Sequence, residues 1–167
     1  MLWSGRFEGK MTPAFKEMNR SLPVDIRLLP YEVKQNLAYA ECMAKVGILS
    51  EKELAAINEG LKQILSEYAD GRYFPLPDDE DIHSLVEIRL TEIIGEAGKK
   101  IHTGRSRNEE VITEVKMYLR DTISAMRKNL RTLVGVLADS ARKNKDVIMP
   151  GYTHMQHAQP ILFAHYL

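Results

Sequence analysis

The stretch RNEEVITEVKMYLRDTISAMRKNLRTLVGVLADSARKN, residues 107–144, decides the fold class of this chain. Its apolar residues recur every three or four positions without a break, and they are Ile112, Val115, Leu119, Ile123, Met126, Leu130, Leu133, Leu137 and Ala141. Their mean spacing is about 3.6 residues, the period of an α-helix. Such a helix is roughly 55 Å long, whereas a compact domain of this size is roughly 40 Å across. We therefore expect the stripe to be buried in a helical bundle, from this chain or from partner subunits, and we expect oligomerisation.

The segments before this helix also carry helical signals. Pro30 suits the first turn of a helix that Gly47 ends. Ser50 and Glu53 form a capping-box pattern at the start of a second helix. A third helix is expected over residues 79–94. Residues 1–29 look irregular because two prolines limit any helix there, and no stretch alternates as a strand does, so the sequence predicts an all-α fold.

The composition favours an ordinary globular protein. Hydrophobic residues make up 44% and charged residues 28%, and 23 basic residues balance 23 acidic ones. The chain therefore lacks the basic excess of a nucleic-acid or membrane-surface binder. It shows no apolar run long enough for a bilayer and no secretory signal. The single cysteine, Cys42, sits among helical apolar positions, which favours a packing role over a nucleophile and fits a reducing cytoplasm.

Four polar clusters could carry chemistry. The first is MNRSLPVD at 18–25, and the second is PDDEDIHSLVE at 77–87, which includes His83. Acidic residues at a helix start suit the helix dipole, so a structural interpretation accounts for most of the second cluster. His83 by itself does not distinguish a structural role of this cluster from a functional one.

The third cluster is HTGRSRNEE at 102–110, directly before the long helix. Short hydroxyl and amide side chains, two arginines and Gly104 together suit a bound carboxylate or phosphate at a helix N-terminus. An ordinary capped helix entry with solvated arginines is the alternative. The pattern of a P-loop is absent.

The fourth cluster is MPGYTHMQHAQPI at 149–161. Histidine is the side chain best matched to proton transfer near neutral pH, and Thr153 beside His154 could hold a substrate carboxylate. A metal site formed by His154 and His157 is disfavoured, because no third ligand is evident. An apolar helix is expected from about Pro160, and because it stops without a polar cap we expect the chain to be a piece of a longer one.

Four motifs in this order resemble one family. LWSGRF at 2–7, DEDIH at 79–83, HTGRSRNEEV at 102–111 and PGYTHMQHAQPI at 150–161 are similar to argininosuccinate lyase, of the fumarase/aspartase superfamily. The resemblance covers essentially the whole chain, as the N-terminal part of that family, and TGRSRN followed by GYTHMQHAQP is its most specific element. Gly is frequent where Ser4 stands, and Arg where His157 stands, but both positions vary within the family.

The resemblance implies an amidine carbon–nitrogen lyase of arginine biosynthesis, cleaving argininosuccinate reversibly to arginine and fumarate without metal or organic cofactor. In this β-elimination a base removes a proton beside a carboxylate, and an acid protonates the departing guanidino nitrogen. Fixed donors around the carboxylate stabilise the intermediate. Matched by position, His154 is the acid/base residue, Ser21, Asn108 and Thr153 bind substrate, and the other active-site positions are Asp25, His83, Arg105 and Arg107.

The resemblance also implies an architecture. Residues 1–105 correspond to an N-terminal helical domain, and residues 106–167 to the beginning of a long central helical bundle. Members are cytoplasmic homotetramers whose active sites draw on three subunits. Family chains are considerably longer, and the serine favoured as the base lies beyond residue 167, so these 167 residues alone should be inactive. Two alternatives remain: another lyase of the superfamily, such as adenylosuccinate lyase, and a non-catalytic, crystallin-like helical protein.

Overall fold

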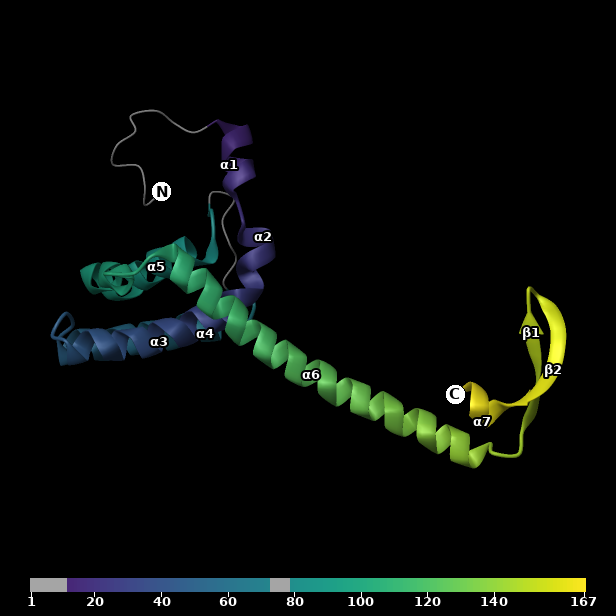
Figure 1. Ribbon diagram of the computed structural model, residues 1–167. Helices are drawn as coiled ribbons and strands as arrows, with labels where there is room; N and C mark the ends of the chain where they lie inside the picture. The colour runs from purple at the N-terminus through teal and green to yellow at the C-terminus, as the bar shows by residue number, and fades with distance from the viewer. Residues whose placement is uncertain (1–11, 73–78) are drawn as a thin grey trace. The chain divides into compact units, whose positions relative to one another are not determined.

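Helices dominate the described part of the chain (Figure 1). The computed structural model describes residues 12–72 and 79–167. The chain divides into two compact units, Met1–Tyr118 and Leu119–Leu167, and α6 contributes to both. The all-α fold class is confirmed, although one β-hairpin adds to it. None of the helices in the described ranges is long and apolar enough to cross a membrane. The LWSGRF motif with Ser4 lies outside the described residues.

Three short helical elements begin the described chain: α1 (Pro13–Asn19), α2 (Leu22–Asp25) and the 3₁₀ helix η2 (Ile26–Leu28). The prediction of irregular structure over residues 12–28 is therefore wrong. Pro13 and Pro23 stand in the first turns of α1 and α2, where a missing backbone N–H costs no hydrogen bond. Each proline therefore begins a helix here and does not prevent one.

The two helices predicted next are confirmed as α3 (Leu29–Lys45) and α4 (Glu51–Ala69). Gly47 follows α3 with a φ of +79°, a conformation that favours glycine and ends a helix. At the start of α4 the backbone N–H of Glu53 donates to Ser50 Oγ at 3.3 Å. The N–H of Ser50 in turn donates to Glu53 Oε2 at 2.9 Å, which completes the predicted capping box.

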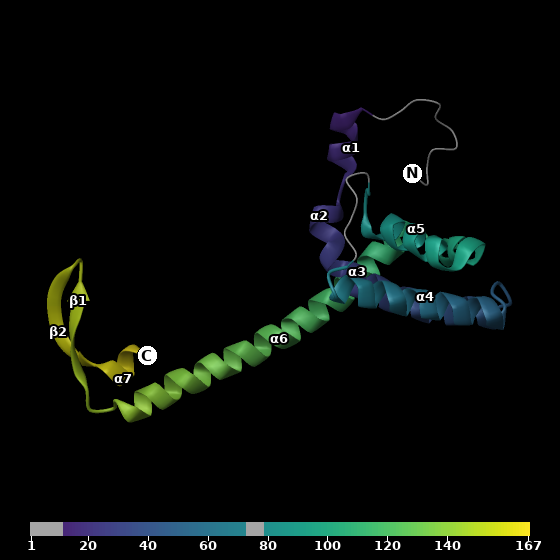
Figure 2. The ribbon, with the colours of Figure 1, turned by 180° about the vertical axis from the view of Figure 1, so that it is seen from behind.

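The core of the first unit lies between α3, α4 and α5 (Ile82–Ile94), with the 3₁₀ helix η3 (Gly95–His102) alongside (Figure 2). Its fully buried apolar side chains include Leu29, Val33, Ala40, Met43, Ile57, Leu61, Ile64, Leu85 and Leu90. A Cβ at Gly60 of α4 would lie 2.6 Å from Leu90 Cδ1, so α4 and α5 approach closely at this glycine. This packing orients the ends of the helices that carry the candidate site.

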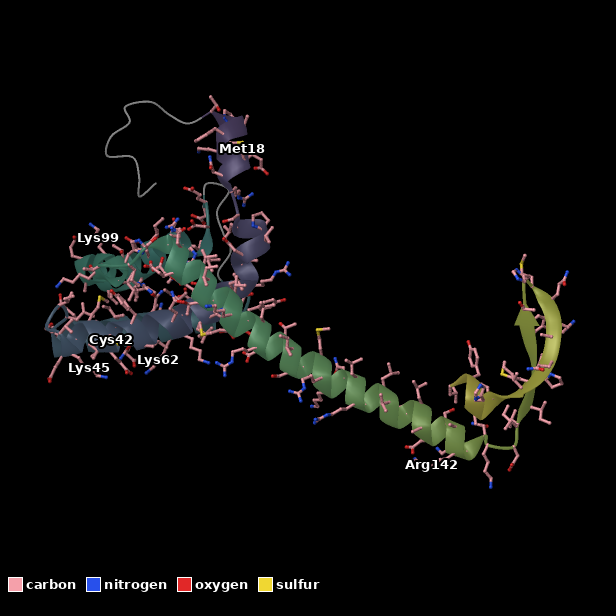
Figure 3. The ribbon with its side chains drawn as sticks, in the orientation of Figure 1. Met18, Cys42, Lys45, Lys62, Lys99 and Arg142 are labelled. Carbon is pink, nitrogen blue, oxygen red and sulfur yellow. The ribbon has the colours of Figure 1, made fainter. Side chains whose placement is uncertain are left out.

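Cys42 on α3 is exposed, with its place marked in Figure 3. The packing role expected for this residue is therefore wrong within the described structure. Val33, Ala40 and Met43 form the buried side of α3, and Cys42 lies one residue from Met43. Successive helical residues are about 100° apart, so Cys42 falls off the buried face.

The long helix is confirmed as α6 (Arg107–Lys143). Val115 and Tyr118, in its first three turns, pack against the core of the first unit. Later members of the predicted apolar stripe stay about half exposed, as at Ile123 (53%), Leu130 (57%) and Leu133 (52%). Within the described chain the stripe is not buried in a bundle.

The histidine stretch forms a β-hairpin, β1 (Ile148–Thr153) paired antiparallel with β2 (Gln156–Leu162), followed by the short helix α7 (Phe163–Tyr166). The prediction that no strand occurs is wrong here, and the helix expected from about Pro160 begins only at Phe163, after the second strand. His154 and Met155 form the two-residue turn with φ of +49° and +61°. Turns with positive φ at both central residues match the twist of paired strands, but they usually contain Asn or Gly, so the sequence lacked that signal.

Candidate functional site

The predicted site residues fall into two groups. Ser21, Asp25, His83, Arg105, Arg107 and Asn108 belong to the first unit, and Thr153 and His154 belong to the second. The residues of the first group lie in, or directly next to, the ends of α2, α5 and α6. Each group is described by itself below.

Ser21 and Asp25 bracket α2. The Ser21 hydroxyl donates to Asp25 Oδ2 at 2.6 Å. The backbone N–H groups of Ser21 and Leu22 both donate to the carbonyl of Glu80, at 3.0 and 3.1 Å, so the first polar cluster is attached to the second. Burial, reinforced by the nearby carboxylate of Asp81, raises the pKa of Asp25, while the Ser21 hydrogen bond opposes this shift.

Asp81 joins the start of α5 to the start of α6. One of its oxygens accepts from the backbone N–H of Ser84 at 2.8 Å and caps α5. The other accepts from Arg107 Nη1, and Arg107 Nη2 also lies 3.3 Å from the Ser84 hydroxyl. The structural interpretation of the acidic cluster therefore holds for Asp81, which also fixes one of the two predicted arginines.

Arg105 is buried more deeply, with 9% of its side chain exposed. Its Nη2 donates to Asn36 Oδ1. It also donates to the Ile101 carbonyl, at 2.8 Å. The same atom lies 3.0 Å from Glu110 Oε1, and the guanidinium stands 4.3 Å from the centre of the Tyr39 ring. Arg105 Nε and Nη1 are buried without a hydrogen-bond partner among the described residues. Arg105 thus links α3, η3 and α6.

The start of α6 is open to solvent beside these partly buried arginines. Ser106 and Asn108 are exposed, and the Asn108 N–H donates to Ser106 Oγ at 3.3 Å. Gly104 has a φ of +74°, and a Cβ there would lie 3.4 Å from the Tyr39 hydroxyl. That hydroxyl donates to the Thr103 carbonyl at 2.7 Å, which holds the loop. The Ser106 N–H donates to Glu109 Oε2 at 2.7 Å, so these contacts are those of the capped helix entry that the sequence offered as the alternative to an anion site.

His83 is buried among three glutamates that sequence reasoning did not single out. Its Nδ1 lies 3.4 Å from Glu32 Oε2, 3.6 Å from Glu114 Oε1 and 4.0 Å from Glu110 Oε2. Burial opposes a charge on the imidazole, but the Glu32 carboxylate outweighs it and raises the pKa of His83. Burial and the adjacent Glu32 raise the pKa of Glu114. The only signal in the sequence was the spacing of four between Glu110 and Glu114, which places both on one side of a helix.

In the second unit Thr153 and His154 are exposed at the tip of the hairpin. His157 lies in β2 opposite Tyr152, whose hydroxyl is 2.8 Å from His157 Nε2. The two rings are 4.7 Å apart and tilted by 39°. His157 thus stands in a strand with a ring partner. His154 presents its imidazole to solvent.

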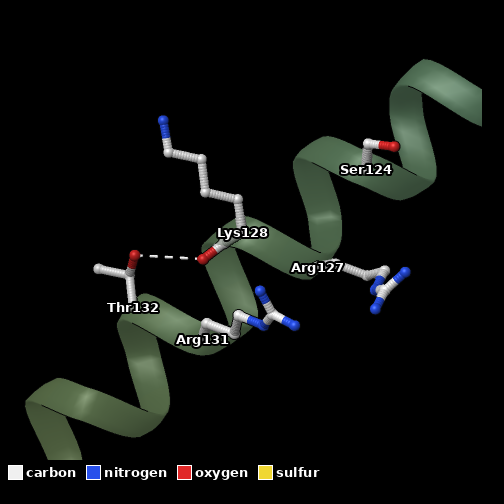
Figure 4. Close-up of a pocket in the computed structure, with 5 residues that line it drawn as sticks. All are labelled: Ser124, Arg127, Lys128, Arg131 and Thr132. Carbon is white, nitrogen blue, oxygen red and sulfur yellow. Dashed lines mark hydrogen bonds between the residues drawn. The ribbon is translucent and has the colours of Figure 1, made fainter.

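A shallow hollow also lies on α6, between Ser124 and Thr132 (Figure 4). Its rim carries the basic side chains of Arg127, Lys128 and Arg131, and the Thr132 hydroxyl donates to the Lys128 carbonyl at 3.2 Å. All these side chains are exposed and belong to one helix. This hollow has no buried polar group and is not a candidate site.

Comparison with known sequences gives consistent results. A protein-family model described as lyase matches residues 5–167. The argininosuccinate lyase of Synechococcus sp. (strain JA-3-3Ab) is 50% identical over 165 residues, which is 99% of this chain and 34% of that protein. The argininosuccinate lyase of Caldanaerobacter subterraneus subsp. tengcongensis is 46% identical over 166 residues, covering 99% and 37%. The chain therefore spans about a third of the length of the curated relatives it matches.

Solved structures show the same likeness. An EDDS lyase variant with bound fumarate has a TM-score of 0.65 and 26% identity, covering 95% of this chain and 32% of that chain. A fumarate lyase from Mesorhizobium sp. BNC1 has a TM-score of 0.59 and 24% identity, covering 83% and 33%. At that identity the second likeness concerns the fold alone.

Proposed function

Because this chain belongs to the lyase family, whose model matches residues 5–167, we propose that it forms part of an argininosuccinate lyase. The reaction is the reversible cleavage of argininosuccinate to arginine and fumarate, a step of arginine biosynthesis. The observation that carries this proposal is 46–50% identity to proteins named argininosuccinate lyase over 99% of the chain. Fumarate bound to the related EDDS lyase variant supports a four-carbon dicarboxylate product.

The chemistry we propose is a β-elimination in which His154 transfers a proton. An exposed imidazole at the tip of a hairpin is free to meet a substrate, and histidine is the side chain best matched to proton transfer near neutral pH. Thr153 beside it would bind a substrate carboxylate. A base beyond residue 167 would remove the proton next to that carboxylate, so these residues hold only a share of the site and would be inactive alone.

The first unit would supply the remaining substrate contacts. Ser21 and Asn108 are exposed polar groups at the starts of α2 and α6. The Asn108 amide can donate to a substrate carboxylate, and so can the Ser21 hydroxyl once it turns away from Asp25. Arg107, Arg105, His83 and Asp25 lie behind them with partners in the protein. We propose that these four shape the charge of the site, and that Arg107 reaches the substrate because 20% of its side chain is exposed.

The architecture we propose has an N-terminal domain at 1–105 and the start of a central bundle at 106–167, in a cytoplasmic homotetramer. The half-exposed apolar stripe of α6 supports burial against further helices. In such a tetramer the hairpin and the start of α6 would come from different subunits to complete one site.

The test uses the full-length gene product and follows fumarate release from argininosuccinate by absorbance. His154→Asn should lower kcat by roughly 10²- to 10⁴-fold, the usual contribution of an acid/base group. His157→Asn, three residues away in the same hairpin, is the matched control and should stay near the parent's activity. Unchanged turnover in His154→Asn would remove it from the mechanism. Cleavage of adenylosuccinate but not argininosuccinate would assign another substrate.

A further inference from the structure

Tyr39 of α3 contacts the loop that joins η3 to α6. This loop covers residues 103–106, and Arg107 and Asn108 follow it in the first turn of α6. Both of these residues belong to the substrate site proposed above. Sequence reasoning did not single out Tyr39, which precedes Thr103 by 64 positions. Its contact with the loop arises only because α3 packs against η3.

The hydroxyl of Tyr39 lies at the point where the chain turns out of η3. It donates to the carbonyl of Thr103, the residue that ends η3, at 2.7 Å. Carbonyls at the end of a helix have no partner within the helix, so this one is satisfied from outside. The next residue is Gly104, whose φ is +74° and whose Cβ, if it had one, would lie 3.4 Å from the same hydroxyl. The hydroxyl therefore fixes the position of this turn.

The ring of Tyr39 contacts Arg105 in the same loop. The guanidinium carbon stands 4.3 Å from the ring centre, and 9% of the Arg105 side chain is exposed. Within the described residues, Arg105 Nε and Nη1 are buried without a hydrogen-bond partner. A guanidinium over an aromatic ring is stabilised, and more strongly when water is excluded. Asn36, three positions before Tyr39 on the same helix, accepts from Arg105 Nη2. One side of α3 thus holds Arg105 at two places.

The loop and the first turn of α6 are linked by their own hydrogen bonds. The Ser106 N–H donates to Glu109 Oε2 at 2.7 Å, and the Asn108 N–H donates to Ser106 Oγ at 3.3 Å. These bonds join neighbouring residues, so they hold the segment together without fixing it to the rest of the protein. Contacts with other helices supply that attachment, and the contacts of Tyr39 lie directly before the substrate-site residues.

We propose that Tyr39 is a positioning residue, which holds this loop so that Arg107 and Asn108 stand where they meet a carboxylate of the substrate. This inference rests on the proposed function. A displacement of about 1 Å at a substrate-binding group can cost about 100-fold in rate. Donors to a carboxylate that gains charge in the intermediate act only when their position is fixed in advance. Tyr39 therefore acts through the loop and does not touch the substrate.

Packing alone is the competing role for this side chain. Tyr39 is partly buried and packs against the core of the first unit. Packing requires the ring, whereas the contact with Thr103 requires the hydroxyl. Tyr39→Phe keeps the ring over Arg105 and removes only the hydrogen bond to the loop. Tyr39→Leu removes both contacts, so comparison of the two variants separates the hydroxyl from the ring.

The test uses the full-length gene product and measures kcat and KM for argininosuccinate cleavage together with the Tm. Tyr39→Phe should lower kcat by about 10-fold with a smaller change in KM and a Tm close to that of the parent. Tyr39→Leu should lower kcat by about 100-fold. Tyr68→Phe is the matched control, because Tyr68 also packs against the core but lies near the end of α4. Glu53, which pairs with Lys100 of η3, lies near the other end of that helix. This control should keep the parent's kcat.

A second measurement needs no substrate. Hydrogen exchange of the backbone amides at 103–108 should be faster in Tyr39→Phe than in the parent, and unchanged in Tyr68→Phe, because the loop opens more often without its contact to α3. Parent-like kcat in Tyr39→Phe, with or without a lower Tm, would overturn the positioning role, and so would parent-like exchange in the loop. A parent protein that does not cleave argininosuccinate would instead refute the proposed function, and the exchange result would still decide whether Tyr39 holds the loop.

Discussion

Arg105 and Arg107 stand two positions apart in one loop, yet their surroundings differ. Arg105 faces Asn36, Glu110 and the Tyr39 ring, whereas Arg107 faces Asp81 at the start of α5. The residue types in the loop indicated an anion site. They could not show that each arginine already pairs with groups of the protein itself. Contacts across more than 20 positions of sequence decide that, and they depend on how α3 and α5 pack.

A third arginine gives a pH prediction. Arg89 Nε and Nη2 donate to the two oxygens of Glu67 at 2.9 and 2.8 Å, which lowers the pKa of Glu67. A carboxylate with a lowered pKa in the folded state stabilises the protein above its unfolded pKa of about 4.3. That stabilisation is lost as the pH falls through the folded value.

Glu67→Gln should therefore reduce stability by about 0.5–1 kcal/mol at pH 7 and by almost nothing near pH 3. Thermal unfolding of the full-length parent and variant at both pH values measures this difference. Glu92→Gln is the control, because Glu92 makes only a more exposed contact with Arg89. An equal loss of stability at both pH values would contradict the assignment.

At the scale of elements, α4 illustrates what local sequence can specify. Its start is set by reciprocal hydrogen bonds between Ser50 and Glu53, and its buried face repeats at Ile57, Leu61 and Ile64. Both signals join residues three or four positions apart, so they can be recognised without a tertiary structure.

The hairpin of β1 and β2 is the opposite case, because local sequence did not predict it. Its turn requires positive φ at His154 and Met155, residues that usually avoid it.

Ser50→Ala removes the acceptor for the Glu53 N–H and should lower stability by about 1 kcal/mol. Chemical denaturation of the full-length protein, compared with Ser66→Ala in the same helix, measures the effect. Ser66 is exposed in the interior of α4, where alanine is at least as favourable to the helix. Equal stability of parent and Ser50→Ala would show that the capping box contributes nothing.

At the scale of the whole molecule, the apolar stripe of α6 has the clearest consequence. Leu119, Ile123, Met126, Leu130 and Leu133 are each 46–58% exposed. A continuous apolar surface of this kind marks an interaction site. The oligomer expected from the sequence stays a prediction, and the exposed stripe is its physical basis.

The isolated 167-residue chain should therefore associate in solution. Light scattering should give a mass above the 19.1 kDa of one chain. Ile123→Glu combined with Leu130→Glu should reduce the association, because charges on the stripe must be desolvated in any interface. A monodisperse monomer with cooperative unfolding would contradict the prediction. Glutamate at the exposed polar positions Asn129 and Thr132 is the matched control.

The sequence by itself determined the helical class, the bounds of α3, α4 and α6 to within a few residues, and the motifs that the family comparison bears out. Periodicity, caps and motif spelling are properties of neighbouring residues, so they can be recognised along the chain. The cluster of Glu32, His83 and Glu114 and the hairpin around His154 were decided only by tertiary structure. Both depend on contacts or backbone angles that side-chain types along a chain do not specify, because burial and pairing arise only when helices and strands pack.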